Sequence, residues 1–197
     1  FSNQEETVNN DQYIGRIDYT WSARHSLFGR YFITNYNQPS YYSPTNILLT
    51  STAGNDERVQ TFTLGDTFIV TPHLVNTFHG TYSRRRDTRG PTAGGINATT
   101  LGADLYVYTP VDLRLTVTNN FSTGCGTWAP GFFNVNTEDF TDDVDYLHGK
   151  HQFAFGGEII RTGDNTNTGY LYNGNYTFSG QLSGANNENV GGPLIDF

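Results

Sequence analysis

Residues 12–22 alternate between apolar and polar side chains with a period of two. From position 12 to position 22 the even positions are mostly polar, whereas the odd positions carry Tyr13, Gly15, Ile17, Tyr19 and Trp21. Successive side chains of a strand point to opposite faces, so this pattern predicts a strand with one apolar and one polar face. After a short turn over 23–26 the chain resumes as a second such strand. The pattern therefore predicts a hairpin near 12–36.

Two further hairpins are predicted near 58–84 and 139–162, with tight turns at Pro72 and Gly149. Long connections over 37–57 and 85–138 separate the three hairpins, with one more short strand expected at 113–118. Structureless loops of this length are uncommon in a compact domain. Short turns at one end and long loops at the other are normal in outer-membrane barrels, and each arm has about the 9–11 residues that a tilted spanning strand needs.

The expected fold is therefore an all-β, antiparallel, up-and-down meander that forms a segment of a transmembrane β-barrel. Taken alone it should be an open curved sheet, because its strands are too few to close a wide barrel. We expect Tyr13, Ile17, Tyr19 and Trp21 to share the outward face, with Arg16 and Asp18 toward the lumen. We also expect all three short turns at the periplasmic end. The whole chain, 1–197, is interpreted as one partial barrel domain.

Composition narrows the choice of partners. Of the 197 residues 15 % are aromatic and 22 are Gly, and the net charge is −8. This charge disfavours binding to nucleic acid through phosphate neutralisation, and the basic run Arg84–Arg86 with Arg89 is interpreted as a solvated strand end. No apolar run approaches the roughly 18 residues of a spanning helix. The two ends show neither a signal-peptide pattern nor a terminator, which favours an internal piece of a longer protein.

The candidate chemistry is mostly negative. The densest acidic group could form a Ca²⁺ site or a carboxylate pair for glycoside hydrolysis, but its spacing does not match an EF-hand loop, and a strand places Asp142 on the opposite face from Asp139, Asp143 and Asp145. His148 and His151 have no third ligand nearby in the sequence. No nucleophile elbow, Walker loop or dinucleotide fingerprint is present. We expect no catalytic residue, no cofactor and no metal, and the protein is not expected to be an enzyme.

Aromatic residues in the long loops are the candidate ligand-binding groups. Exposed rings beside polar residues suit the capture of a sugar or a peptide, and they equally suit packing within the loops. The candidates are Tyr41, Tyr42 and Trp128, with Tyr106 and Tyr108 in the same class.

Several segments resemble a known family. Tyr13–Tyr19 followed by His25–Tyr31 resembles barrel hairpins of TonB-dependent outer-membrane transporters, above all the large Oar-like receptors of acidobacteria. Thr61–Thr67 followed by Thr71–Asn76 looks like another of these hairpins. The most specific likeness is Lys150-His151-Gln152 with Gly157 after an Asp-rich strand. The resemblance covers roughly residues 10 to 197.

The resemblance implies a segment of a receptor in the bacterial outer membrane that binds and imports a large nutrient, such as an oligosaccharide, a peptide or a chelate. Such receptors also have a carboxypeptidase-like β-sandwich, a plug and a barrel of roughly 22 strands, and only barrel strands are recognised here. The implied partners are outer-membrane lipid, the nutrient, and TonB through a region outside this chain. Relatives often have a second cysteine near Trp128. This sequence has none, so Cys125 is expected to be a free thiol and no loop disulfide is expected. The alternative is a secreted, non-enzymatic β-sandwich, either an adhesin or a carbohydrate-binding module.

Overall fold

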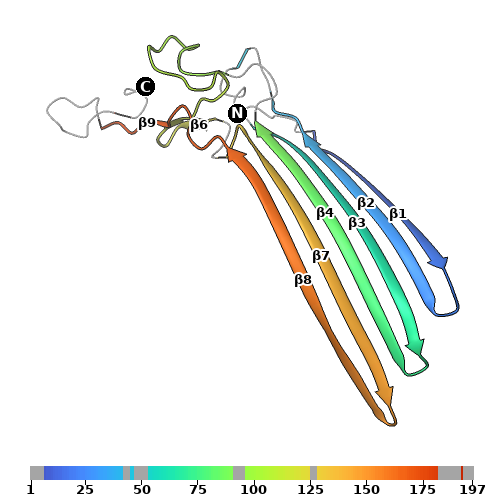
Figure 1. The fold of residues 1–197 in the computed structure, drawn as a ribbon. Helices are drawn as coiled ribbons and strands as arrows, with labels where there is room; N and C mark the ends of the chain where they lie inside the picture. The colour runs from blue at the N-terminus through green and yellow to red at the C-terminus, as the bar shows by residue number, and fades with distance from the viewer. Residues whose placement is uncertain are drawn as a thin grey trace.

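The computed structural model describes residues 7–41, 45–46, 53–90, 96–124, 128–181 and 192. Within them six long strands form one antiparallel sheet in the order β1-β2-β3-β4-β7-β8 (Figure 1). These strands are β1 (Asn9–Thr20), β2 (His25–Gln38), β3 (Gly54–Thr71), β4 (Leu74–Gly90), β7 (Gly131–His148) and β8 (His151–Thr168). A second sheet, in the order β6-β5-β9, consists of β5 (Leu115–Val117), β6 (Phe121–Thr123) and β9 (Tyr176–Phe178). The described residues include no helix that is both long and apolar enough to cross a membrane.

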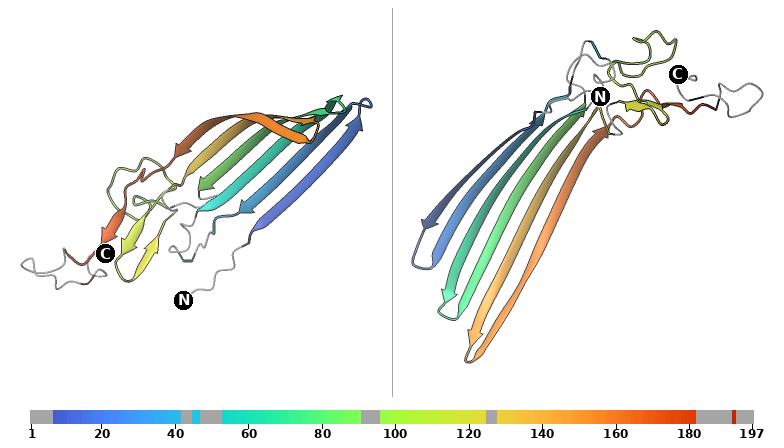
Figure 2. Two further views of the ribbon diagram at one scale, coloured as in Figure 1. Left: turned by 90° about the horizontal axis from the view of Figure 1, so that it is seen from below. Right: turned by 180° about the vertical axis from the view of Figure 1, so that it is seen from behind.

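The six-stranded sheet is the predicted meander. Each predicted hairpin pairs with itself, and β2 pairs with β3 and β4 with β7, all antiparallel. The three short turns lie together at one end of the sheet and the long connections at the other (Figures 1 and 2). No second layer of strands covers the sheet in the described part of the chain, and β1 and β8 form open edges there. The expectation of an open, antiparallel, all-β sheet is confirmed, and the sheet-on-sheet packing of the β-sandwich alternative is not found.

The short turns follow from their sequences. In the first turn Ser22 Oγ accepts hydrogen bonds from the backbone N–H groups of Arg24 and His25, at 3.2 and 3.1 Å. In the third turn Gly149 occupies the first of the two turn positions. Its φ is 60°, a conformation that glycine adopts without strain. One detail differs from the prediction, since Trp21 lies in the first turn and not in β1.

The strands are longer than the sequence pattern predicted. The predicted loops 37–57 and 85–138 begin or end inside strands, because β4 continues to Gly90 and β7 starts at Gly131. The extension of β4 carries polar residues on both faces, whereas at the start of β7 Phe133 and Val135 lie on the polar face, out of phase with the apolar residues farther along the strand. The short strand expected at 113–118 is present as β5, whereas β6, β9 and the parallel pairing of β5 with β9 were not foreseen.

The register sorts the side chains of the sheet into two faces of opposite character. Residues opposite each other in an antiparallel ladder lie on the same face. One face, named the apolar face, carries the odd residues of β1, β2 and β8 and the even residues of β3, β4 and β7. Its apolar members include Tyr13, Ile17, Tyr19, Leu27, Tyr31, Ile33, Phe62, Leu64, Phe68, Leu74, Phe78, Tyr82, Phe140, Val144, Tyr146, Phe153, Phe155 and Ile159. The other, named the polar face, carries Arg16 and Asp18, as predicted.

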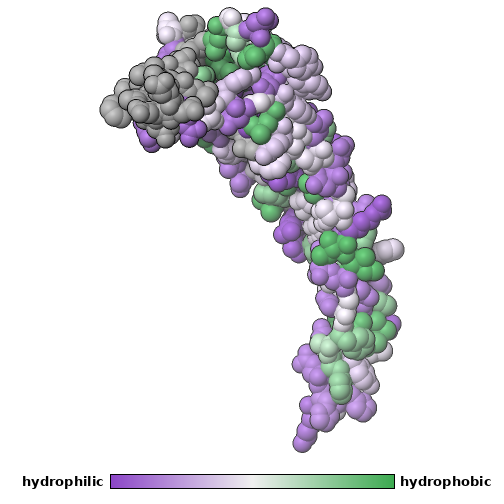
Figure 3. All heavy atoms as spheres, turned by 90° about the vertical axis from the view of Figure 1, so that its left-hand side faces the viewer, coloured by the Kyte–Doolittle hydropathy of each residue, from purple (hydrophilic) through white to green (hydrophobic). Residues whose placement is uncertain are grey.

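Burial is the reverse of that in a soluble sheet. On the central strands Phe62 and Leu64 of the apolar face are 49 % and 46 % exposed, whereas Thr63 between them is only 7 % exposed. Side chains on the concave side of a curved sheet crowd together, so the polar face is the inner one. Figure 3 shows hydrophobic patches on the strands toward the turns and further ones at the opposite end of the molecule, with hydrophilic residues at the turns themselves. Large aromatic side chains therefore point outward, away from any core within the described residues.

The apolar side chains of the apolar face form a band across the sheet, named the apolar band. The edge of this band toward the loops moves regularly from hairpin to hairpin. On the first hairpin the last apolar residues toward the loops are Tyr13 and Ile33, which pair with each other. Ile33 faces the polar Gln60 on β3. On the second hairpin the band therefore ends two residues lower, that is, closer to the short turns, at the pair Phe62 and Tyr82. Tyr82 in turn faces Glu138, and on the last hairpin the band ends two residues lower again, at the pair Phe140 and Ile159. A flat boundary that crosses tilted strands produces such steps.

The loop end of the sheet carries a small unit of its own, named the cap (residues 96–124, 128–130 and 169–181). The buried apolar residues of the described chain all belong to the cap: Ala98, Leu113, Leu115, Val117 and Ala129. The connection between β4 and β7 is joined to the segment after β8 by the pairing of β5 with β9. The loops are therefore not structureless, because they share a core separate from the long strands.

Asn173 and Arg114 join the two segments of the cap. Asn173 Oδ1 accepts hydrogen bonds from the backbone N–H groups of Tyr108 and Thr109, at 2.9 and 3.0 Å. Its Nδ2 donates to the carbonyl oxygens of Thr109 and Asp112, both at 2.6 Å. The buried Arg114 donates through Nη2 to the carbonyl oxygens of Ala129 and Gly169, at 3.1 and 3.4 Å. A single asparagine therefore satisfies four backbone groups across more than 60 residues of sequence.

Asp112 lies fully buried beside Arg114, with 3.6 Å between Oδ1 and the guanidinium Nε. Burial raises the pKa of the Asp112 carboxyl, and the nearby positive charge of Arg114 offsets part of this increase. Neither carboxyl oxygen has a hydrogen-bond partner among the described residues. Because the pKa is higher in the folded cap than in the open one, protonation of Asp112 stabilises the cap, and this contribution is lost as pH rises through the raised pKa.

We predict that Asn173→Ala opens the cap. The substitution leaves two N–H groups and two carbonyl groups without their partner, at about 1–3 kcal/mol for each buried unsatisfied group. Hydrogen exchange at Tyr108 and Thr109 should rise at least tenfold in the intact protein, while exchange in the long strands stays unchanged. The matched control is Asn175→Ala, since Asn175 is exposed. Equal protection in the two variants would contradict the role given to Asn173.

We also predict that the cap tightens as the pH falls. After correction for intrinsic exchange, protection of the cap amides should increase as Asp112 takes up its proton. In Asp112→Asn, which is neutral at every pH, this dependence should disappear. A pH dependence of the same size in the variant would show that another group is responsible.

Candidate functional site

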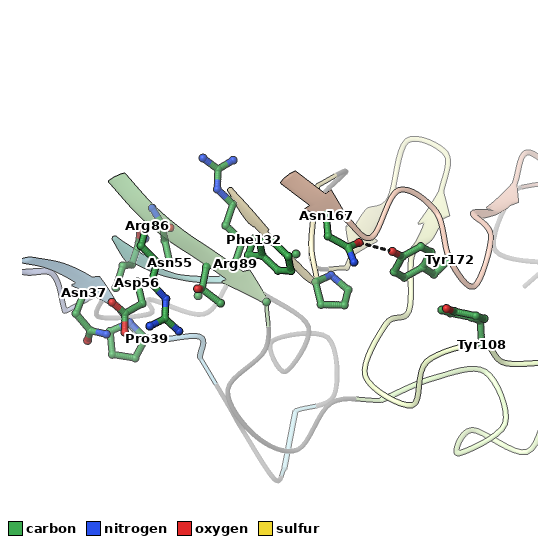
Figure 4. A pocket seen from close by; sticks show the side chains of 16 residues that line it. Asn37, Pro39, Asn55, Asp56, Arg86, Arg89, Tyr108, Phe132, Asn167 and Tyr172 are labelled. Atoms are coloured by element: carbon green, nitrogen blue, oxygen red, sulfur yellow. Dashed lines mark hydrogen bonds between the residues drawn. The ribbon is translucent and has the colours of Figure 1, made fainter. Parts of the chain in front are cut away.

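A cavity of about 970 Å³ lies at the loop end, between the strand ends and the cap (Figure 4). Strands β2, β3, β4, β7 and β8 contribute residues to it, and the cap contributes Tyr108, Pro130 and Tyr172. Small-molecule sites have volumes of about 300–1,000 Å³. The cavity is therefore large enough for a ligand with several rings or several peptide units.

Two tyrosines from distant parts of the sequence form the aromatic side of the cavity. The rings of Tyr108 and Tyr172 contact each other, with centroids 4.9 Å apart and planes tilted by 52°. Tyr172 Oη donates a hydrogen bond of 2.9 Å to Asn167 Oδ1 at the end of β8 (Figure 4). Asn173 fixes the backbone at Tyr108 and follows Tyr172 directly, so one residue positions both rings.

The strand ends form the polar side of the cavity. Asn37 from β2, Asp56 from β3 and Thr88 from β4 lie in one row on the apolar face of the sheet, beyond its last apolar residues, with Arg86 next to them. Amides both donate and accept, carboxylates accept, and guanidinium groups donate. Polar groups of mixed kind opposite aromatic rings are suited to a ligand with hydroxyl or amide groups and apolar ring faces.

An ionic network lies on the polar face at the same end of the sheet. Asp87, which has no exposed surface, accepts from Arg85 Nη2 at 3.1 Å and from Arg89 Nη2 at 2.8 Å. Arg85 also donates through Nε to Glu57 at 2.6 Å, and the Arg89 guanidinium lies 4.8 Å from the centroid of the Phe133 ring. The charges of the two arginines are balanced by two carboxylates, so this network stiffens the strand ends.

Of the aromatic residues singled out from the sequence, Tyr108 lines this cavity, and the others lie outside it or outside the described residues. Trp128 is 51 % exposed and packs on Tyr170, with ring centroids 5.6 Å apart. Tyr41 is partly buried and does not line the cavity, and Tyr42 lies outside the described residues, as does Cys125. Sequence reasoning missed Tyr172 and Asn167, because only the folded cap brings them against Tyr108.

The acidic and histidine groups are dispersed. Asp139, Asp143 and Asp145 lie on the polar face, and Asp142 lies on the apolar face, where Asn76 Nδ2 donates to its Oδ1 at 2.7 Å. His25 Nδ1 lies 3.0 Å from Asp66 Oδ2, and its ring stacks on Phe68. Within the described residues no three His, Cys, Asp or Glu side chains form a group that could hold a metal ion.

The comparison with protein families supports a barrel wall whose apolar face points outward and whose polar face points inward. Residues 1–197 match the family model described as an outer membrane beta barrel domain. No curated protein and no solved structure matches the sequence. The family match places the chain in the bacterial outer membrane, where short turns lie at the periplasmic end and long loops at the extracellular end. An outward apolar face, an inward polar face and a boundary stepped across tilted strands are the features of such a barrel wall, and the chain belongs to the outer membrane beta barrel domain family.

Proposed function

We propose that the chain forms part of a TonB-dependent receptor that binds a large nutrient at the cell surface and imports it. The observation that carries this proposal is the cavity of about 970 Å³ at the extracellular end, where Tyr108 and Tyr172 lie opposite amide and charged groups. The strand residues Asn37, Asp56 and Thr88 reach it from the outward face above the apolar band, so the cavity would capture the nutrient at the rim of the barrel before passage. An oligosaccharide, a peptide or a metal chelate presents the hydroxyl, amide and ring surfaces that such a lining recognises. The resemblance of the hairpins to Oar-like receptors supports the same function.

The open edges support a large barrel. The sheet has six strands, and β1 and β8 each lack a second neighbour within the described residues. Unpaired backbone groups are too costly inside a membrane to remain so, and further strands must close the wall. A barrel of roughly 22 strands has room for a plug and a nutrient path. The polar face, rich in Thr, Ser and Asp, would line that path.

The proposal assigns binding and passage to this chain, and energy coupling to a region elsewhere. TonB would contact the receptor at the periplasmic side through a segment outside this sequence. No catalytic step is proposed, because the carboxylates of β7 are divided between two faces of the sheet and do not form a pair across a site.

The orientation of the wall can be tested with spin labels in the intact protein. Labels at Ile17→Cys and Tyr19→Cys should be relaxed by lipid-soluble oxygen, because these positions face the hydrocarbon. Labels at Asp18→Cys and Thr63→Cys should be relaxed by a water-soluble nickel chelate. The opposite pattern would show that the faces are assigned the wrong way round.

The transport function can be tested in cells that express the intact receptor, with a panel of labelled oligosaccharides, peptides and metal chelates. One class should accumulate, and loss of TonB should abolish accumulation while surface binding remains. Tyr172→Ala removes an aromatic wall and should weaken that binding at least tenfold, as truncated aromatic anchors do at about 2 kcal/mol. The control is Tyr106→Ala, since Tyr106 is 84 % exposed and outside the cavity. Uptake that is independent of TonB, or binding that is equal in both variants, would contradict the proposal.

A further inference from the structure

Three arginines lie together on the apolar face, which points outward, just beyond the loop-side edge of the apolar band. They are Arg58 on β3 and Arg84 and Arg86 on β4, and all three are exposed. Arg58 and Arg86 are directly opposite each other in the ladder, and Arg84 is opposite Gln60. This group, named the arginine patch, is unexpected in a chain of net charge −8, since like charges facing each other across a ladder are destabilising.

The charge of the arginine patch is left largely uncompensated. Arg58 Nε donates a hydrogen bond of 2.6 Å to the neutral amide oxygen of Asn35. Within the described part of the chain, Arg84 and Arg86 form no ion pair or side-chain hydrogen bond. On this face of β3 the neighbouring row contains one carboxylate, that of Asp56. On the same strand Arg85 and Arg89 point to the other face and are each paired with a carboxylate.

The surface around Arg86 is hollowed on both sides. One hollow of about 170 Å³ lies among Asp56, Arg58, Arg86 and Thr88. Another of about 380 Å³ lies between Arg84, Arg86, Phe132 and Asn134. The guanidinium groups therefore line concave surface that an anion can enter from outside.

The height of the arginine patch matches one layer of the membrane. Arg84 and Arg86 lie two and four residues beyond Tyr82, the last apolar residue of β4. At about 3.3 Å per residue and a tilt of about 35°, these steps rise roughly 5 and 11 Å above the band. The headgroup layer occupies roughly 5–8 Å on each side of the hydrocarbon core, and long arginine side chains reach back toward it. Because this is the loop end, the layer is that of the outer leaflet.

We propose that the arginine patch binds the phosphate groups of a phosphorylated lipid in the outer leaflet. Guanidinium groups bind phosphate oxygens through paired, charge-assisted hydrogen bonds, and an anion between Arg58 and Arg86 removes their mutual repulsion. A lipid is favoured over a soluble anion because Phe62 and Tyr82 lie directly below, where they would contact its acyl chains. Arg86 also lines the candidate nutrient cavity, so the inference is tested by lipid retention, which does not depend on which nutrient the receptor takes.

The test uses the intact protein in phosphatidylcholine nanodiscs that contain lipid A with both phosphates or the same lipid without them. Wild-type protein should retain the phosphorylated lipid, as measured by mass spectrometry of the bound lipids, and should retain the dephosphorylated lipid at least tenfold less. The triple variant R58Q/R84Q/R86Q should lose this preference. The matched control R24Q/R30Q/K150Q removes the same charge from the turns and the polar face and should keep it. Asp56→Asn, which removes the neighbouring carboxylate, should strengthen retention several-fold.

The outcomes separate the alternatives. Equal retention of both lipids by the wild-type protein overturns the proposal, whether or not the triple variant folds. Loss of preference in the control as well would reduce the effect to net charge and would also overturn it. If inorganic phosphate displaces the lipid at equal concentration, the arginine patch is a site for a soluble anion, and the lipid proposal is overturned. None of these measurements involves nutrient uptake, so failure here leaves the transport proposal standing, and the reverse also holds.

Discussion

The continuous ladder of backbone hydrogen bonds between neighbouring strands is the interaction that holds the long sheet together. In a soluble sheet the burial of one face against a second layer would share this task, but here the outward face has no such layer in the described residues. Inside hydrocarbon each unpaired N–H or C=O group costs several kcal/mol, so every strand needs a partner on both sides. The open edges at β1 and β8 therefore require further strands as partners, and the apolar face follows from contact with the hydrocarbon itself.

The cap is surrounded by a different solvent from the membrane-spanning strands. It lies in water at the extracellular end, and it is stabilised as a small soluble domain is, by buried aliphatic residues and by polar groups that satisfy one another. Asn173 is the clearest case, because it replaces several backbone-to-backbone hydrogen bonds that the irregular chain cannot make for itself. The cavity lies where the two units meet and takes its tyrosines from one and its amides and charges from the other.

How far the sequence could be interpreted depended on which solvent each residue meets. The hairpins were visible because lipid on one face and water on the other impose strict alternation, as in Tyr13 to Tyr19. Above the membrane both faces are wet, so the extension of β4 to Gly90 is polar on both faces, and the start of β7 has Phe133 and Val135 on the polar face, out of phase with the rest of the strand. The pairing of β5 with β9 and the contact of Tyr108 with Tyr172 join positions about 60 residues apart. No local pattern encodes such contacts, and for this reason the candidate cavity could not be found from the sequence.

The stepped boundary of the apolar band measures the inclination of the strands. The band shifts by two residues, about 6.7 Å, for every two strands, which span about 9.6 Å. The ratio of these lengths corresponds to an angle of about 35° between the strands and the barrel axis, at the lower end of the roughly 35–45° usual for outer-membrane barrels. It also corresponds to a stagger of about one residue per strand, so a barrel closed with this geometry has a shear number close to its number of strands. Because the shift occurs between hairpins and not within them, the strand that joins β8 must end its own apolar residues about two residues lower than Ile159, and the strand that joins β1 about two residues higher than Tyr13.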